Sequence, residues 1–172
     1  MVIVRSKPVS ERPRPSSEIA MLYEQHGRMV YNVCLRVLSN PSAAEDATQA
    51  VFLLLMRKTG SLQQHPQLAG WLQRTAELVA REGRRADLRR QKREQEAVKM
   101  AQDLNSTTPE LDSAWSEIRP RLDRAIAELP DRYRSPLVMV YLEGQEQKEV
   151  ARVLNLHEGT LRWRLSHAVE RL

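Results

Sequence analysis

The amino-acid sequence predicts an all-α protein made of two small helical domains joined by a flexible linker. Leu, Ala, Arg, Glu and Gln, which favour helices, dominate its 172 residues. Apolar residues recur at three- and four-residue steps and do not alternate with polar residues over any useful stretch. A polar segment without an apolar period separates two such helical regions, which indicates a domain boundary.

Four segments follow from these patterns. Residues 1–15, with three prolines and four basic side chains, are predicted to be a disordered basic tail. Residues 16–98 form the first helical domain. Residues 99–110 form the linker and contain Asn105-Ser106-Thr107-Thr108-Pro109. Residues 111–172 form the second domain.

The first domain begins with a helix that starts at Ser16 or Ser17 and ends near Leu38. Its predicted buried stripe consists of Ile19, Leu22, Tyr23, His26, Val30, Val33 and Val37. Asn40 is a good N-cap for a second helix, and Pro41 suits the first position of that helix. This second helix is expected to end near Lys58.

The second helix is apolar on all sides between Ala50 and Met56. A helix in so small a domain has one inner face, so some of these side chains are expected to point outward. An exposed apolar patch usually marks a site for a partner. The alternative is that two flanking helices bury all of them.

A third, long helix is expected from Gln67 or Leu68 to about Ala97, after a polar loop. Trp71, Leu72, Thr75, Leu78 and Val79 form the buried stripe of its front half. Its rear half is basic, with seven basic residues against two acidic ones between Arg81 and Arg93. Such a stretch is typical of a surface that binds a polyanion, although a solvated helix face is the alternative.

The second domain opens with two predicted helices. One runs from about Leu111 to Leu129, where Pro130 ends it, and its apolar stripe consists of Leu111, Trp115, Ile118, Leu122, Ile126 and Leu129. The next runs from Asp131 to Glu143 and carries Tyr133, Leu137, Val140 and Tyr141 on one face. Gly144 then closes it.

The last segment has the pattern of a helix-turn-helix. A short helix from Glu146 to Leu154 and a turn at Asn155-Leu156-His157 precede a second helix from Glu158 to Leu172. The inward side chains are predicted to be Val150, Ala151, Leu154, Leu161, Leu165, Ala168 and Leu172. Asn155 tolerates the left-handed backbone that such a turn needs. This arrangement suits insertion of the second helix into the major groove of DNA, and an ordinary helical hairpin is the alternative.

Composition excludes several classes of protein. The net charge of +5 and the pI of about 9.7 favour a polyanionic partner. Cys34 is the only cysteine and no two of the four histidines have zinc-ligand spacing, so we expect no disulfide, metal or cofactor. The sequence contains no phosphate-binding glycine loop and no nucleophile–base pair, so we do not expect an enzyme. Without an apolar run of about 20 residues or a signal peptide, the chain is expected to be cytoplasmic, with no membrane insertion.

Four stretches, in order and at family spacing, resemble the motifs of a known family. They are Ala44–Phe52 (AEDATQAVF), Leu68–Leu72 (LAGWL), Leu129–Arg134 (LPDRYR) with Tyr141–Gly144 (YLEG), and Glu158–Leu165 (EGTLRWRL). From about Ser17 onward the chain resembles a bacterial extracytoplasmic-function (ECF) RNA polymerase sigma factor. The resemblance implies a region 2 domain, a flexible linker and a region 4 domain.

The same resemblance implies a transcription initiation subunit that binds core RNA polymerase and recognises promoters. Its second helix would dock on the clamp helices of the polymerase β′ subunit, with the β flap as a further contact. The implied polymerase-binding residues are Asp46, Gln49, Phe52 and Leu53. Family members are often held by an anti-sigma factor, which makes such a protein an expected partner.

Promoter DNA is the other partner that the resemblance implies. The third helix and the loop before it would melt and hold the minus-ten strand through Trp71, Arg74, Arg81, Arg84, Arg85 and Arg89. The helix-turn-helix would read the minus-thirty-five duplex through Thr160, Arg162, Trp163, Arg164, His167 and Arg171. Glu77 departs from the family, which often has an asparagine near this place, and would put a carboxylate close to DNA. His157 departs too, since a Ser or Thr usually caps this helix.

The residues alone leave two other functions open. One is a two-domain DNA-binding regulator that never engages polymerase, and the surface around Asp46 and Gln49 would distinguish it. The other is a degenerate sigma-like protein that titrates an anti-sigma factor. The mark of that function would be partner binding without affinity for promoter DNA.

Overall fold

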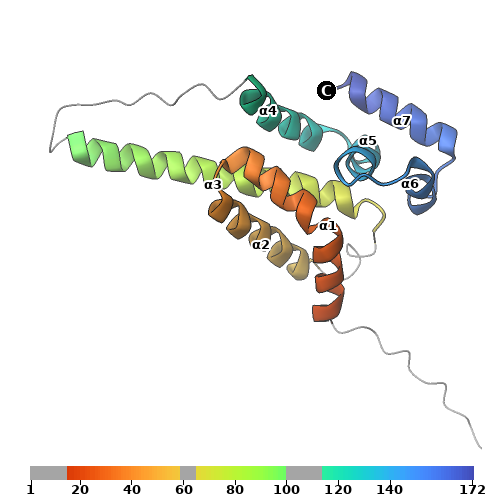
Figure 1. Ribbon diagram of the computed structural model, residues 1–172, viewed down its shortest axis with the longest axis horizontal. Helices are drawn as coiled ribbons and strands as arrows, with labels where there is room; N and C mark the ends of the chain where they lie inside the picture. The colour runs from red at the N-terminus through yellow and green to blue at the C-terminus, as the bar shows by residue number, and fades with distance from the viewer. Residues whose placement is uncertain (1–14, 59–64, 100–113) are drawn as a thin grey trace, which may run out of the picture.

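The computed structural model describes residues 15–58, 65–99 and 114–172, and all regular structure in these ranges is helical (Figure 1). The elements are α1 (Pro15–Leu38), α2 (Pro41–Arg57), α3 (Leu68–Lys99), α4 (Ala114–Glu128), α5 (Asp131–Leu137), the π-helix η1 (Val138–Leu142), α6 (Gln147–Val153) and α7 (Glu158–Glu170). Apart from Pro15, which begins α1, and Lys99, which ends α3, the predicted tail and the predicted linker lie outside the described residues. None of the described helices is long and apolar enough to cross a membrane.

Helices α1, α2 and α3 pack side by side and form the first body of the fold (Figure 1). The predicted cap of α2 is confirmed, because the Asn40 side chain accepts a hydrogen bond of 3.0 Å from the backbone N–H of Ala43. Ser39 adopts a φ of +54°, which reverses the chain between α1 and α2. The apolar core between the three helices includes Val30, Val33, Val51, Leu55, Leu72 and Ala76.

The helix predicted from Asp131 to Glu143 is continuous but changes from an α-helix to a π-helix. It is α-helical as α5 and becomes a π-helix in η1, where the N–H of Glu143 donates to the carbonyl of Val138 over 3.0 Å. A π-turn holds one residue more than an α-turn, and η1 leads into Glu143, whose Oε1 lies 2.5 Å from Nδ1 of His26 on α1. Gly144 then closes the helix, as expected, with a left-handed backbone at φ +72°.

The sequence predicted the inner face of α4 only in part. Ile126 and Leu129 are buried as expected, but Ile118 and Leu122, also expected to be buried, are exposed, whereas Asp123 is buried. The Asp123 carboxylate accepts a bidentate pair of hydrogen bonds from Arg36 of α1, with Nε–Oδ2 at 2.6 Å and Nη2–Oδ1 at 2.7 Å. The ion pair with Arg36 therefore holds the side of α4 that carries Asp123 against α1.

The two predicted domains share one apolar core. Buried side chains of α1, α2 and α3 continue into those of α4, α5, η1, α6 and α7 as one cluster, and α3 touches α4, α5 and η1. Gly70 allows α3 and α5 to approach each other closely, because it has no side chain. A Cβ at this position would lie 2.5 Å from Oγ and 3.1 Å from Cα of Ser135 on α5. The structure thus shows the two halves packed together.

Arg134 joins three helices at this junction. Its Nη1 donates to the carbonyls of Ala127 (2.9 Å) and Leu129 (2.5 Å) at the end of α4, and its Nε donates to the carbonyl of Gly70 on α3 (3.1 Å). Its Nη2 pairs with Asp131. Burial lowers the pKa of Arg134 to about 10, so the guanidinium stays protonated at neutral pH.

Glu77 is buried between α3 and α4 and does not face solvent. Burial raises the pKa of Glu77, and the positive charge of Arg81, whose Nε lies 3.7 Å from Oε1, opposes that rise. The expectation that Glu77 presents a carboxylate to DNA is therefore wrong for this arrangement. Its charge is held against α4 instead.

Replacing Arg134 with methionine is expected to destabilise the protein by about 2–4 kcal/mol, because three carbonyls would lose a buried charged donor. Urea unfolding would measure this loss. The matched control is Arg132→Met, at an exposed arginine that lies over the Tyr133 ring at 4.8 Å. Equal stability of the two variants would contradict the role given to Arg134.

Replacing Glu77 with glutamine is expected to stabilise the protein at neutral pH. Since the folded-state pKa is raised, ionisation of Glu77 costs stability as the pH rises through and above the unfolded value. The gain should therefore disappear in acid below that value, where both states are protonated. Urea unfolding at several pH values tests this, with Glu82→Gln at an exposed site of α3 as the control. A less stable variant at pH 7 would show that attraction to Arg81 outweighs burial.

Candidate functional site

The outer face of α2 is the first candidate surface. Asp46 and Gln49 are exposed on it, as is Leu53. Within the apolar run, the exposed side chains are Leu53 (57%), Leu54 (39%) and Met56 (52%). The expectation that part of this run points outward is confirmed, and the alternative that flanking helices bury it all is wrong.

Phe52 does not belong to this outer face, which corrects the expectation for it. Its side chain is 5% exposed and packs against Tyr23 of α1, with ring centroids 4.9 Å apart. The helical period explains the correction, because Phe52 follows Thr48 by one turn and both side chains face α1. Phe52 therefore supports the surface from behind.

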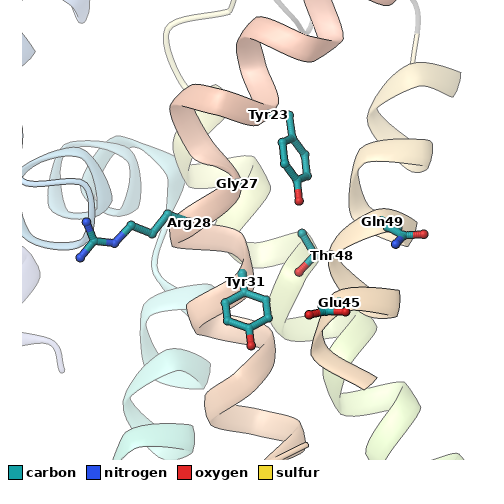
Figure 2. Close-up of a pocket in the computed structure, with 7 residues that line it drawn as sticks. All are labelled: Tyr23, Gly27, Arg28, Tyr31, Glu45, Thr48 and Gln49. Carbon is teal, nitrogen blue, oxygen red and sulfur yellow. The ribbon is translucent and has the colours of Figure 1, made fainter. Parts of the chain in front are cut away.

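A hollow of about 430 Å³ between α1 and α2 adjoins this face (Figure 2). It is lined by Tyr23, Gly27, Arg28, Tyr31, Glu45, Thr48 and Gln49. Figure 2 shows the Tyr23 ring and the Glu45 carboxylate lying in the space between the helices, while Arg28 points away from it. Sequence reasoning missed this hollow, because its walls come from two helices and follow no motif. It offers a recess for a side chain that a docking partner inserts.

The start of α3 is the second candidate surface. Trp71 is half-buried, and Lys58 lies over its ring with Nζ at 5.8 Å from the centroid. Trp71 and Arg74 line a hollow of about 270 Å³ that Asp131 and Arg134 complete from α5. These two predicted DNA-binding residues thus lie together, but against the other half of the protein.

The rear half of α3 extends past the other helices as a basic arm (Figure 1). Arg84, Arg85 and Arg89 are exposed on it, while Arg81 is half-buried beside Glu77. Arg85 and Arg89 both approach Glu82, at 3.8 Å and 3.2 Å. The polyanion-binding role of this arm stays a prediction.

The helix-turn-helix is formed by α6 and α7. Asn155 has the predicted left-handed backbone, with a φ of +51°, and the N–H of Leu156 closes the turn on the carbonyl of Ala151 at 2.8 Å. Leu161, Leu165 and Ala168 are buried as expected. Leu172 is exposed, which is a correction, because it lies beyond the last residue of α7. His157 makes no side-chain cap.

The outward face of α7 carries the predicted DNA-reading side chains. Thr160, Arg162 and Arg171 are exposed, whereas Arg164 and His167 are half-buried. Trp163, 53% exposed, stacks on His167 with ring centroids 4.6 Å apart. Tyr133 of α5 lies beside both rings at 6.2 Å, and the Arg171 guanidinium lies over it at 5.4 Å. Tyr133 was expected only as a core residue. Its ring also packs beside Trp163 and His167 and supports them from behind.

Comparisons with known proteins agree with the two halves of the structure. Residues 22–94 match the Sigma-70 region 2 family, which corresponds to most of α1, all of α2 and most of α3. Residues 119–172 match the Sigma-70, region 4 family, which corresponds to most of α4 and everything after it. The two matches therefore cover the surfaces described above.

Relatives that match most of the chain are sigma factors as well. The chain is 31% identical over 160 residues to the ECF RNA polymerase sigma factor SigL of Mycobacterium tuberculosis, covering 88% of this chain and 84% of that protein. It is 29% identical over 157 residues to SigE of Mycolicibacterium smegmatis, covering 88% of this chain but 58% of that relative. With SigW of Bacillus subtilis the identity is 25% over 155 residues, covering 83% and 80%. The chain belongs to the ECF family of RNA polymerase sigma factors.

Proposed function

We propose that this chain binds core RNA polymerase through the outer face of α2 and directs it to promoters. The observation that carries this proposal is that one chain combines an exposed mixed polar and apolar face on α2 with a helix-turn-helix whose outer face is basic. A DNA-binding regulator needs only the second surface. The chemistry of RNA synthesis stays with the polymerase.

Region 2 is proposed to hold the minus-ten strand. Trp71 offers a ring on which a base can stack, and Arg74 stands one turn away on the same helix. The basic arm with Arg81, Arg84, Arg85 and Arg89 supplies cations that follow a phosphate backbone. Glu77 lies on the same helix, and its carboxylate is buried as long as α4 packs on it.

Region 4 is proposed to read the minus-thirty-five element as duplex. The exposed positions Thr160 and Arg162 lie in the first turns of α7, the part of such a helix that enters the major groove. Arg164, His167 and Arg171 flank them, and Trp163 presents an aromatic face braced by His167. An arginine there can pair bidentately with guanine.

The partners are proposed in finer detail as well. The β′ clamp helices would take the face around Asp46, Gln49 and Leu53, and the β flap would contact region 4. An anti-sigma factor would compete for these surfaces in the cytoplasm. Purification of the protein from its native cell, with identification of what is bound, tests the partners directly.

In vitro transcription tests the function as a whole. Core polymerase from the native cell is mixed with this protein and a library of the cell's genomic fragments, and transcript start sites are mapped. We expect starts that depend on the protein and share two sequence elements. Failure to bind core polymerase, together with no dependent start, would overturn the proposal.

Changing Asp46 and Gln49 together to alanine is expected to weaken core polymerase binding by about tenfold or more, because both lie at the centre of the α2 face. Duplex binding by region 4 should stay unchanged. Affinity for labelled core polymerase measures the first effect and gel shift the second. Asp87 and Gln91, an exposed acid and amide on α3, give the matched control when changed to alanine. Equal affinities for both double variants would contradict the assignment.

Changing Arg162 to alanine is expected to cost about 1–3 kcal/mol at a cognate minus-thirty-five element if its guanidinium pairs with a base. Competition between cognate and point-altered duplexes measures the loss and its position. Arg124→Ala, at an exposed arginine of α4, serves as the control. A uniform loss on all sequences would make Arg162 a phosphate contact instead.

A further inference from the structure

The outward face of α7 is centred on an aromatic side chain. Leu161, Leu165 and Ala168 are the buried stripe of this helix. At about 100° per residue, Trp163 points about 140–160° away from all three, so it lies opposite the buried stripe. Its side chain is more than half exposed. Trp163 also belongs to the first half of α7, the part of a recognition helix that enters the major groove.

The Trp163 ring is held in place by neighbours on two helices. It stacks on His167, one turn later, with an interplanar angle of 26°. The buried Tyr133 of α5 lies beside both rings, and Oε2 of Glu170 lies 3.4 Å from Nδ1 of His167. The indole therefore presents a flat surface that is ordered before a ligand arrives, which lowers the entropy cost of a contact.

The surroundings of the ring suit a groove of DNA better than an apolar partner protein. The positions three and four residues away on the helix surface are Gly159, Thr160, Ser166 and His167, and none of them is aliphatic. Arginines precede and follow Trp163 directly in the sequence. Such side chains can contact phosphates on either side of a groove while an aromatic ring lies over the bases.

The chemistry of the indole selects among base edges. In the major groove, thymine presents an apolar C5 methyl group, and apolar side chains read it by contact. Adenine, guanine and cytosine present donors or acceptors there. An indole ring offers one donor and no acceptor, so covering one of those edges would leave polar atoms without a partner. The ring of Trp163 therefore favours thymine over the other three bases.

We propose that Trp163 reads one thymine of the minus-thirty-five duplex by covering its C5 methyl group. His167 is the positioning residue, because its ring holds the indole in the orientation that the contact needs. Arg162 and Arg164 contact phosphates or a guanine beside that thymine. This inference rests on the proposed reading of duplex DNA by region 4, and it adds which base α7 selects at one position and by which chemistry.

Replacing thymine with uracil tests the contact, since it removes the methyl group and leaves the pairing and the hydrogen-bonding edge unchanged. The full chain bound to native core polymerase first selects duplexes from a random library. Each thymine of the selected upstream element is then replaced by deoxyuridine, one at a time, and affinity is measured by competition. We expect one thymine at which the replacement weakens binding about fourfold, the effect of exposing one methyl group.

Trp163→Ala should remove the difference between thymine and uracil at that position. The variant keeps the buried stripe of α7, and urea unfolding checks that its stability is retained. Tyr141→Ala is the matched control, because Tyr141 is an exposed aromatic side chain on η1, away from α7, and it should keep the full difference. Cytosine and 5-methylcytosine at the same position give a second comparison, in which only the wild type and the control should gain from the methyl group.

Two variants of His167 test its positioning role. His167→Ala removes the ring beneath the indole and should reduce the preference for thymine over uracil. His167→Phe keeps a flat ring and removes the charge that the imidazole can carry, so it should retain the preference. If both variants instead weaken binding to all duplexes by the same factor and keep the preference, His167 is a phosphate contact and the positioning role is wrong.

The remaining outcomes separate this contact from the proposed function. A wild-type protein that does not distinguish thymine from uracil at any position, or a Trp163→Ala variant that still does, would overturn the proposal. So would a variant that loses affinity for core polymerase and keeps the preference, since Trp163 would then face the polymerase. If no duplex is selected with polymerase, the proposed function fails. Selection by the full chain alone, followed by the same uracil replacements, then still decides the Trp163 contact.

Discussion

The guanidinium of Arg134 is the interaction on which the arrangement of the two halves depends. It donates to carbonyls at the end of α4 and to Gly70 on α3, so one side chain holds the turn into α5 and the contact between the regions. Arginine suits this position because its planar fork carries several donors in fixed directions. The neighbouring Gly70 supplies the space, since the backbones of α3 and α5 approach there without a side chain between them.

The interface around Arg134 adds buried polar groups to the apolar core that the two halves share. Asp123, Glu77 and Gln73 are all buried in it. Replacing such groups with well-packed apolar residues is often neutral or stabilising in proteins, so buried charge is weak evidence for stability alone. Glu77 illustrates this, because its carboxylate lies close to Arg81 while burial against α4 raises its pKa and so disfavours its charged form.

Much of the candidate site could be predicted from the sequence, and the exceptions share one cause. The resemblance named Asp46, Gln49 and Leu53 on α2, the helical period placed Arg162 outward on α7, and all four are exposed. Phe52 was placed outward, but it faces α1 and packs on Tyr23. The hollow between α1 and α2 was not foreseen either (Figure 2). Each exception depends on a second helix distant in the sequence, about which a single helical period carries no information.

The sequence by itself determined the helices, the cap of α2 and the family. These features depend on local physics: propensity, the Asn40 cap, the left-handed backbone at Asn155 and Gly144, and motifs whose spacing lies within one helix or turn. Only the tertiary structure decided that regions 2 and 4 share one core, that α4 buries Asp123 while Ile118 and Leu122 stay exposed, and that Glu77 faces protein. The reason is that a buried polar group is tolerated only where a partner meets it. Partners such as Arg36 for Asp123, and Glu143 for His26, come together through long-range packing that no local pattern records.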